Sequence, residues 1–186
     1  MNARQKKTNL VWIDLEMTGL DPKKCTILEI GVIVTDSQLE VLAEGPEIAI
    51  HHSEKTLRSM EAWSRHAHRL SGLTDECRRS KVSLKKAESA VLEFVRGYCT
   101  SKSSPLCGNT IWQDRRFLVK YMPRLEAYLH YRTIDVSSVK ELVSRWYPED
   151  HKVPRLKKQT HRVMEDIRES IEELKHYRKK VFIPHP

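Results

Sequence analysis

The amino-acid sequence predicts an α/β domain built on a mixed β-sheet, and two observations lead to that fold class. Three apolar stretches rich in β-branched residues come first and have the character of strands. From residue 84 onward, apolar residues recur at the three- and four-residue spacing of amphipathic helices, and short apolar strands separate these helices. Strands in succession, followed by alternating helices and strands, predict an α/β domain whose sheet combines antiparallel and parallel pairs.

The first three strands are predicted within the N-terminal 51 residues. Residues 9–16 are apolar and are followed by a Thr-Gly turn. Residues 26–35 are almost continuously apolar, which indicates a central strand that is buried on both faces. A short Asp-Ser turn leads to the third strand over residues 39–51, which we expect to be broken by Gly45 and Pro46.

Helices and short strands are predicted to alternate along the rest of the chain. The expected elements are a helix over 84–98, a strand over 105–109, a helix over 112–121, a strand over 131–136, a helix that Pro148 ends, and a last helix over 161–178. Ser138 and Glu141 form a capping box, in which each side chain satisfies a backbone N–H at the start of the penultimate helix. Its inner face is expected to carry Val139, Leu142, Val143 and Trp146. Residues 147–160 are polar and basic, which indicates a loop.

The excess positive charge lies at the two ends of the chain. The 186 residues carry a net charge of +8, and residues 1–8 contain three basic residues and no acidic one. Residues 151–186 contain ten basic and five acidic residues, so the 142 residues between hold 20 of each sign. This distribution excludes a uniformly basic, histone-like protein. We expect one domain over residues 9–180, a basic tail over 1–8 and a second tail over 181–186.

The composition narrows the class of protein further. Hydrophobic residues make up 39% and charged residues 31%, a profile of folded rather than disordered or fibrous chains. No apolar run approaches the ~20 residues of a membrane span, and the N-terminus lacks the apolar segment of a signal peptide. The four cysteines show no CxxC spacing. We therefore expect reduced thiols and a cytoplasmic location rather than a zinc site, a disulfide framework or a membrane partner.

Three acidic motifs carry the chemistry that the sequence suggests. Asp14 and Glu16 point to the same face of the first strand, because strand side chains alternate. Such a pair is costly in an apolar strand unless a cation lies between the carboxylates, or unless both reach water at the strand's end. Asp114 lies where a strand leads into a helix, and an acid there can simply complement the helix dipole. His161 and Asp166 begin the last helix, where alone they would indicate a solvated helix start.

Taken together, the three motifs favour a metal site. Four carboxylates carry a charge of about −4, which two Mg²⁺ or Mn²⁺ ions would balance, and such hard cations prefer oxygen ligands. Two ions roughly 3.5–4 Å apart can stabilise the attacking and leaving oxygens of an in-line phosphoryl transfer. A histidine, whose pKa is ordinarily about 6.5, can accept the proton of the attacking water near neutral pH.

The sequence resembles the DEDDh family of 3′→5′ exonucleases and, within it, the oligoribonucleases. The likeness runs from about Asn9 to Arg178 and is carried by WIDLEMTGLDP (12–22), ILEIGVIVTD (27–36), residues 107–142 and HRVMEDIRESIEELKHYR (161–178). It implies an RNase H-like fold with a five-stranded mixed sheet flanked by helices. It also implies a homodimer that hydrolyses short single-stranded RNA, from dinucleotides to about pentanucleotides, into 5′-mononucleotides. The positions that match the family's metal-binding carboxylates are Asp14, Glu16, Asp114 and Asp166, and His161 matches its general base.

The resemblance also implies substrate contacts. Leu20 and Tyr131 match side chains that sandwich the bases, with the tyrosine entering the catalytic site from the second subunit, and Trp63 and His68 match positions beside the 3′ nucleotide. The positions that match a polar cap on the 5′-phosphate are Thr110, Arg132, Ser137 and Ser138. An aromatic face binds any base for ~1–3 kcal/mol, and a cap at the 5′ end would exclude longer chains. Trp63 and Tyr131 have alternative interpretations as core or dimer-interface residues, and Ser138 has one as a helix cap.

The sequence departs from the family pattern at two of these motifs, where Thr110 replaces the usual Ser and Glu165 replaces the usual Asp. Two other functions stay open from the residues alone. One is the same hydrolysis on longer RNA or DNA. The other is a nucleic-acid-binding module with structural carboxylates, which the basic ends would favour. No protein partner other than a second copy of the chain is predicted.

Overall fold

A single mixed sheet forms the centre of the molecule. The computed structural model describes residues 5–151 and 162–182. The strands are β1 (Leu10–Met17), β2 (Ile27–Thr35), β3 (Val41–Ala49), β4 (Leu106–Gly108) and β5 (Thr133–Asp135), and their order in the sheet is β3-β2-β1-β4-β5. The β1–β2 and β2–β3 pairs are antiparallel, whereas the β1–β4 and β4–β5 pairs are parallel. The predicted five-stranded mixed sheet is therefore confirmed.

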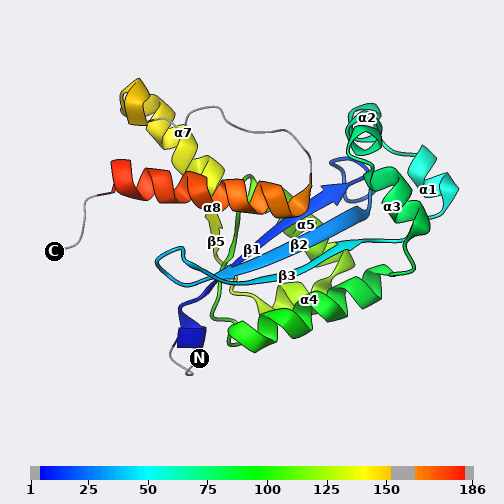
Figure 1. Cartoon of the computed structure of the whole chain (residues 1–186), viewed down its shortest axis with the longest axis horizontal. Coiled ribbons are helices and arrows are strands. Elements are labelled where there is room, and N and C mark those ends of the chain that lie inside the picture. The colour runs from blue at the N-terminus through cyan, green and yellow to red at the C-terminus, as the bar shows by residue number, and fades with distance from the viewer. Residues whose placement is uncertain (1–4, 152–161, 183–186) are drawn as a thin grey trace.

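Helices cover both faces of this sheet. They are α1 (Glu54–Arg58), α2 (Ala62–Leu70), α3 (Leu73–Arg79), α4 (Leu84–Tyr98), α5 (Ile111–Tyr121), α6 (Pro123–Tyr128), α7 (Val136–Trp146) and α8 (Val163–Lys180), with short 3₁₀ turns at Gln5–Lys7 and Glu149–His151. Figure 1 shows α7 and α8 on one side of the strands, α4 on the other, and α1 to α3 grouped at one end of the sheet. No helix in the described ranges is both long and apolar enough to cross a bilayer.

Side-chain alternation along β1 decides which residues face α8. Val11 and Ile13 pack into the apolar cluster that includes residues of α4, α5 and α6, whereas Trp12 packs into the cluster of α7 and α8. Asp14 and Glu16 follow Trp12 at two-residue intervals and therefore lie on the α8 side. The predicted common face of the two carboxylates follows from this alternation.

Two predicted features of the elements are wrong, and a third is wrong in part. Gly45 and Pro46 do not break the third strand, because the β2–β3 register shifts there and the pair is accommodated as an irregularity within β3. The cap of α7 is Asp135, whose carboxylate accepts the Ser137 backbone N–H at 3.0 Å, so Ser138 lies inside the helix. On the predicted inner face of α7, Val139 packs against the core and Val143 is buried, but Leu142 and Trp146 are 44% and 69% exposed.

Four helices were not predicted from the sequence. Helices α1 to α3 occupy the stretch between β3 and α4, and α6 follows α5 directly. A small buried cluster holds α1 and α3 to the sheet, formed by Leu57, Met60, Leu73 and Cys77 against Leu28 of β2. The four cysteines of the chain are unbridged and buried.

Candidate active site

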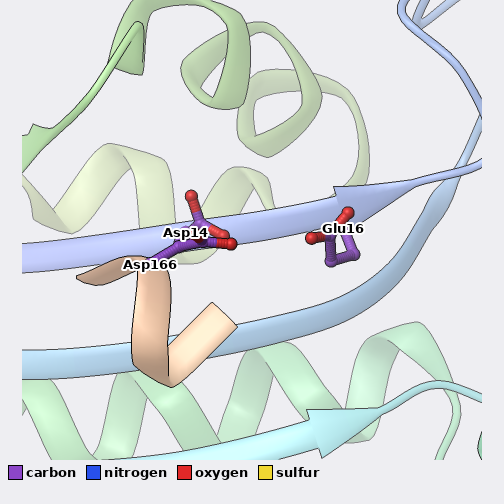
Figure 2. A group of neighbouring side chains, drawn as sticks. All are labelled: Asp14, Glu16 and Asp166. Carbon is purple, nitrogen blue, oxygen red and sulfur yellow. The ribbon is translucent and has the colours of Figure 1, made fainter. Parts of the chain in front are cut away.

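Strand β1 and helix α8 bring three acidic side chains together. Asp14 and Glu16 project from β1, and Asp166 lies in the first turn of α8. A carboxylate oxygen from each of them lies within 4.8 Å of the others. Figure 2 shows Asp166 reaching toward Asp14, with Glu16 further along the same side of β1. Residues that are about 150 positions apart in the sequence thus form one group that can hold a metal ion.

Asp114, the fourth acid, approaches the same strand from helix α5. Its Oδ1 accepts the backbone N–H of Leu15 at 3.0 Å. Leu15 lies beyond the short β1–β4 pairing, so the carboxylate provides this N–H with the acceptor that β4 does not supply. Its negative charge adds to the effect of burial, which is the main cause that raises the pKa of Asp14. Asp114 itself is 5% exposed and stands outside the three-residue group.

Burial and mutual repulsion raise the pKa values of these acids. Burial is the largest cause for Asp14, followed by the charges of Asp114 and Asp166. Burial also raises the pKa of Glu16 to about 9, with the charges of Asp166 and Glu29 adding to it. Burial likewise raises the pKa of the Asp114 carboxyl. Buried carboxylates that repel one another are the donor set that hard divalent cations stabilise, so the residues fit such ions.

The end of β1 contacts His68 of helix α2. His68 is fully buried, and its Nε2 lies 3.0 Å from the carbonyl oxygen of Met17 and 3.7 Å from Oε2 of Glu16. Because a carbonyl only accepts, this nitrogen carries the proton of the bond. His68 therefore contacts the C-terminal end of β1 next to Glu16.

Thr110 and Ser137 come together at the N-terminal end of α5, one turn before Asp114. The backbone N–H of Thr110 donates to Oγ of Ser137 at 2.9 Å and to Oδ1 of Asp135 at 3.1 Å, and the two hydroxyl oxygens lie 3.1 Å apart. Thr110 adopts a left-handed backbone conformation with φ of 53°, as the residue that leads from β4 into α5. Ser138 is exposed, and no hydrogen bond in the described residues joins it to this pair.

Residues 11–174 match the model of a protein family described as Exonuclease. The oligoribonuclease of Dichelobacter nodosus is 53% identical over 178 residues, which cover 96% of this chain and 97% of that protein. The oligoribonuclease of Halorhodospira halophila is 54% identical over 172 residues, covering 92% and 93%. The chain belongs to this exonuclease family, in its oligoribonuclease branch. The family resemblance inferred from the sequence motifs is thereby confirmed.

Solved structures of exonuclease I share the fold. The enzyme from Methylocaldum szegediense superposes with a TM-score of 0.71 at 16% identity, over 93% of this chain and 41% of that one. E. coli exonuclease I in complex with a dT13 oligonucleotide also gives 0.71, at 15% identity, over 93% and 41%. This chain therefore spans about two fifths of those larger exonucleases, and the likeness establishes the RNase H-like exonuclease fold.

The apolar and aromatic side chains that the family resemblance assigns to substrate contacts are exposed. Leu20 and Trp63 are each 64% exposed and Tyr131 is 71% exposed, so the alternative interpretation of Trp63 and Tyr131 as core residues is wrong. The carbonyl of Leu20 accepts a hydrogen bond of 2.6 Å from Nε2 of Gln113, which ties the Leu20 loop to the residue before Asp114. The guanidinium of Arg132 lies over the ring of Tyr131, 5.4 Å from its centroid, and Nε donates to the Tyr131 hydroxyl at 3.0 Å.

His161 lies outside the described residues, but its neighbour Arg162 is well anchored. Arg162 donates at 2.9 Å to Glu29 of β2 and at 2.9 Å to Glu76 of α3, and its carbonyl accepts the N–H of Asp166 at 3.1 Å. Glu29 is fully buried and is the cross-strand partner of Glu16. Neither Glu29 nor Arg162 was predicted as a site residue. A single acid within the apolar stretch 26–35 is, however, a sequence signal for a buried ion pair.

Proposed function

We propose that this protein is a 3′→5′ exoribonuclease of the cytoplasm that degrades short oligoribonucleotides, from dinucleotides to about pentanucleotides, to 5′-mononucleotides. The observation that carries the proposal is the convergence of Asp14, Glu16 and Asp166. It occurs in a chain that matches oligoribonucleases at 53% identity over nearly its whole length. A purely structural role for these acids is disfavoured, because a fold gains nothing from repelling carboxylates that burial has moved away from their ordinary pKa values.

The proposed cofactors are two divalent cations, Mg²⁺ or Mn²⁺, held by Asp14, Glu16, Asp114 and Asp166. When bound, such ions stabilise negative charge on the attacking and leaving oxygens of the phosphodiester. Asp14 and Glu16 would hold them on one face of β1, and Asp166 would close the site from α8. Asp114 keeps one oxygen on the Leu15 N–H, which fixes its orientation and leaves the other oxygen for a metal. His161 would accept the proton of the attacking water.

Further residues are proposed to contact the substrate. Leu20 and Trp63 present exposed apolar surface that would contact the bases. His68, which contacts Glu16 and the Met17 carbonyl, would lie beside the 3′ nucleotide. Thr110 and Ser137 would bind the 5′-phosphate together with Arg132, which is a charge-assisted contact of the kind that guanidinium groups make with phosphate. Of the proposed cap residues, Ser138 has the least support, because it is exposed and separate from the Thr110–Ser137 pair.

We also propose that the protein is a homodimer in which Tyr131 enters the site of the second subunit. Large apolar side chains are exposed on helices α5 and α7, namely Trp112, Val119, Leu142 and Trp146. Exposed apolar groups of this size are characteristic of protein–protein interfaces. Tyr131, which is also exposed, lies just before β5 and α7 in the chain.

A length series of 5′-phosphorylated RNA, from two to ten nucleotides, tests the proposed function. With Mn²⁺ present, the rate should be highest on the dinucleotide and fall with length, and EDTA should abolish it. Asp14→Asn should abolish hydrolysis, because it removes one charge of the metal site while retaining the shape. Asp36→Asn is the matched control, since Asp36 lies in the β2–β3 turn and an amide oxygen can still accept its two backbone N–H bonds.

Each alternative has its own outcome in this series. A preference for the ten-nucleotide substrate would exclude the dinucleotide assignment and favour an exonuclease of longer chains. Tight RNA binding in EDTA with no cleavage in Mn²⁺ would identify a binding module. Hydrolysis that is unchanged in Asp14→Asn would exclude the proposed metal site.

A further inference from the structure

A buried carboxylate of helix α8 lies behind the Thr110–Ser137 pair. Glu173 is 4% exposed, and its Oε1 accepts the hydroxyl of Tyr177 at 3.1 Å and lies 3.1 Å from Nζ of Lys140 on α7. Its Oε2 accepts Nδ2 of Asn109 at 3.0 Å. A buried carboxylate is retained where several donors satisfy it together. Glu173 therefore links α8 to Lys140 of α7 and to Asn109, the residue that follows β4.

Glu173 dictates which way the Asn109 amide points. An ionised carboxylate can only accept, so the Asn109 nitrogen must face α8, where it also donates to Oγ of Ser170 at 2.9 Å. The Asn109 oxygen is then turned toward α7 and accepts the hydroxyl proton of Ser137 at 3.0 Å. One buried charge thus fixes the proton position of a hydroxyl that lies two hydrogen bonds away.

The same chain of bonds orients Thr110. Because the Ser137 hydroxyl donates its hydrogen bond to Asn109, its oxygen acts as the acceptor for Thr110. It accepts the Thr110 backbone N–H at 2.9 Å and the Thr110 hydroxyl at 3.1 Å. Asp135 accepts the backbone N–H groups of both Thr110 and Ser137. The backbone donors of the pair are therefore engaged, and the Thr110 hydroxyl is the donor that can turn to a phosphate while the backbone bond stays intact.

We propose that Asn109 and Glu173 are positioning residues that determine the preference for a 5′-phosphate. They hold the Ser137 oxygen as a fixed acceptor for Thr110, which leaves the Thr110 hydroxyl as the donor that can turn to the phosphate. The inference rests on the proposed function, because it assumes that this pair caps the substrate. Neither residue touches the substrate. Without Glu173 the Asn109 amide is free to turn over, and Ser137 then loses its fixed acceptor.

The test compares kcat/KM on a 5′-phosphorylated dinucleotide with that on the same dinucleotide bearing a 5′-hydroxyl. The wild-type protein should prefer the phosphorylated substrate. Asn109→Ala and Glu173→Gln should each lower that preference by roughly tenfold or more, the scale of one hydrogen bond to a charged group. The loss should appear in KM for the phosphorylated substrate, with a much smaller effect on the 5′-hydroxyl substrate. Glu172→Gln is the control, because Glu172 directly precedes Glu173 on α8 but is exposed and pairs with Lys175.

A double mutant separates positioning from general damage to the fold. If Asn109 acts through the Thr110 hydroxyl, Asn109→Ala should lower the preference little further in a Thr110→Val background. Equal losses on both substrates, or an unchanged ratio in both single variants, would overturn the inference. A wild-type protein without any 5′-phosphate preference would also overturn it. In that case metal-dependent cleavage of dinucleotides would still support the proposed function.

Discussion

Replacement of Glu16 by glutamine should stabilise the protein in the absence of metal. The side chain projects from β1 into a group of acids and is only 9% exposed. Burial, and then the charges of Asp166 and Glu29, raise its pKa from 4.5 to about 9. Glutamine has nearly the same shape and never carries the charge that the folded protein disfavours.

The size of the effect follows from the difference between the folded and unfolded pKa of Glu16. Between pH 4.5 and about 9 the folded protein retains a proton on this carboxyl that the unfolded chain releases. The free energy of unfolding therefore falls as pH rises through that window, by about 1.4 kcal/mol per pH unit. At pH 7 the loss is on the order of 3 kcal/mol. For a chain of this length that corresponds to a melting temperature roughly 6–12 °C higher in Glu16→Gln.

Thermal unfolding in EDTA at pH 6, 7 and 8 measures this difference. The gap between the variant and the wild type should widen with pH, and added Mn²⁺ should narrow or reverse it. A ligand at a hundred times its Kd stabilises the wild type by about 2.7 kcal/mol. Glu88→Gln is a matched control, because Glu88 is also buried but accepts the backbone N–H groups of Arg124 and Leu125. Equal melting temperatures in EDTA at all three pH values would refute the reasoning.

Three further predictions concern the surroundings of the site. Gly31→Ala would place a Cβ 2.7 Å from Cγ2 of Val163, so it should destabilise the protein by roughly 1–3 kcal/mol in urea unfolding and lower the rate of hydrolysis. A variant as stable as the wild type would contradict the packing of α8 on β2. Arg162→Ala should lower the free energy of unfolding by about 3–5 kcal/mol, because it leaves buried Glu29 without its cation. Arg162→Lys should recover part of this stability, and an alanine variant as stable as the wild type would be inconsistent with the ion pair. Trp146→Glu should convert a dimer to a monomer in sedimentation velocity with little change in the melting temperature, and a persistent dimer would locate the interface elsewhere.

The elements that could be predicted are those whose apolar pattern is visible within their own stretch of sequence. Strand β2 is continuously buried and α4 has apolar residues on one side, so both could be located from the sequence. Helices α1 and α3 are only five and seven residues long and are held by a few contacts to Leu28. Isolated helices of that length are not stable, so their existence depends on tertiary packing that a local pattern does not record.

The start of α7 illustrates a different limit. Both Asp135 and Ser138 are good capping residues, and the Glu141 spacing favoured the serine. The sheet decides between them, because β5 ends at Asp135 in register with Gly108 and the chain must leave the sheet there. That same choice places Ser137 in the first turn of α7, where it meets Thr110.

For the candidate site, strand alternation alone placed Asp14 and Glu16 on one face. The approach of Asp166 depends on how α8 crosses β1, which no spacing in the sequence specifies, and it was expected only because the motifs resemble a known family. The burial of His68 had no such signal, because a histidine in a polar stretch is ordinarily a surface residue.

The electrostatics of this face of the sheet distinguish two kinds of buried acid. Glu29 and Glu16 are cross-strand partners, but they differ in what they contact. Arg162 donates to Glu29 at 2.9 Å, whereas the Nε2 of His68 lies 3.7 Å from Glu16. Burial raises the pKa of both carboxyls, and the charge of Arg162 opposes this shift. At Glu29 it is the next cause after burial, whereas at Glu16 it is the smallest. An arginine placed between Asp14 and Glu16 would stabilise the fold in the same way, but it would occupy the position that a divalent cation needs. Within residues 5–151 and 162–182, no arginine or lysine pairs with Glu16 as Arg162 pairs with Glu29, and the group formed by Asp14, Glu16 and Asp166 can hold a metal ion in that position.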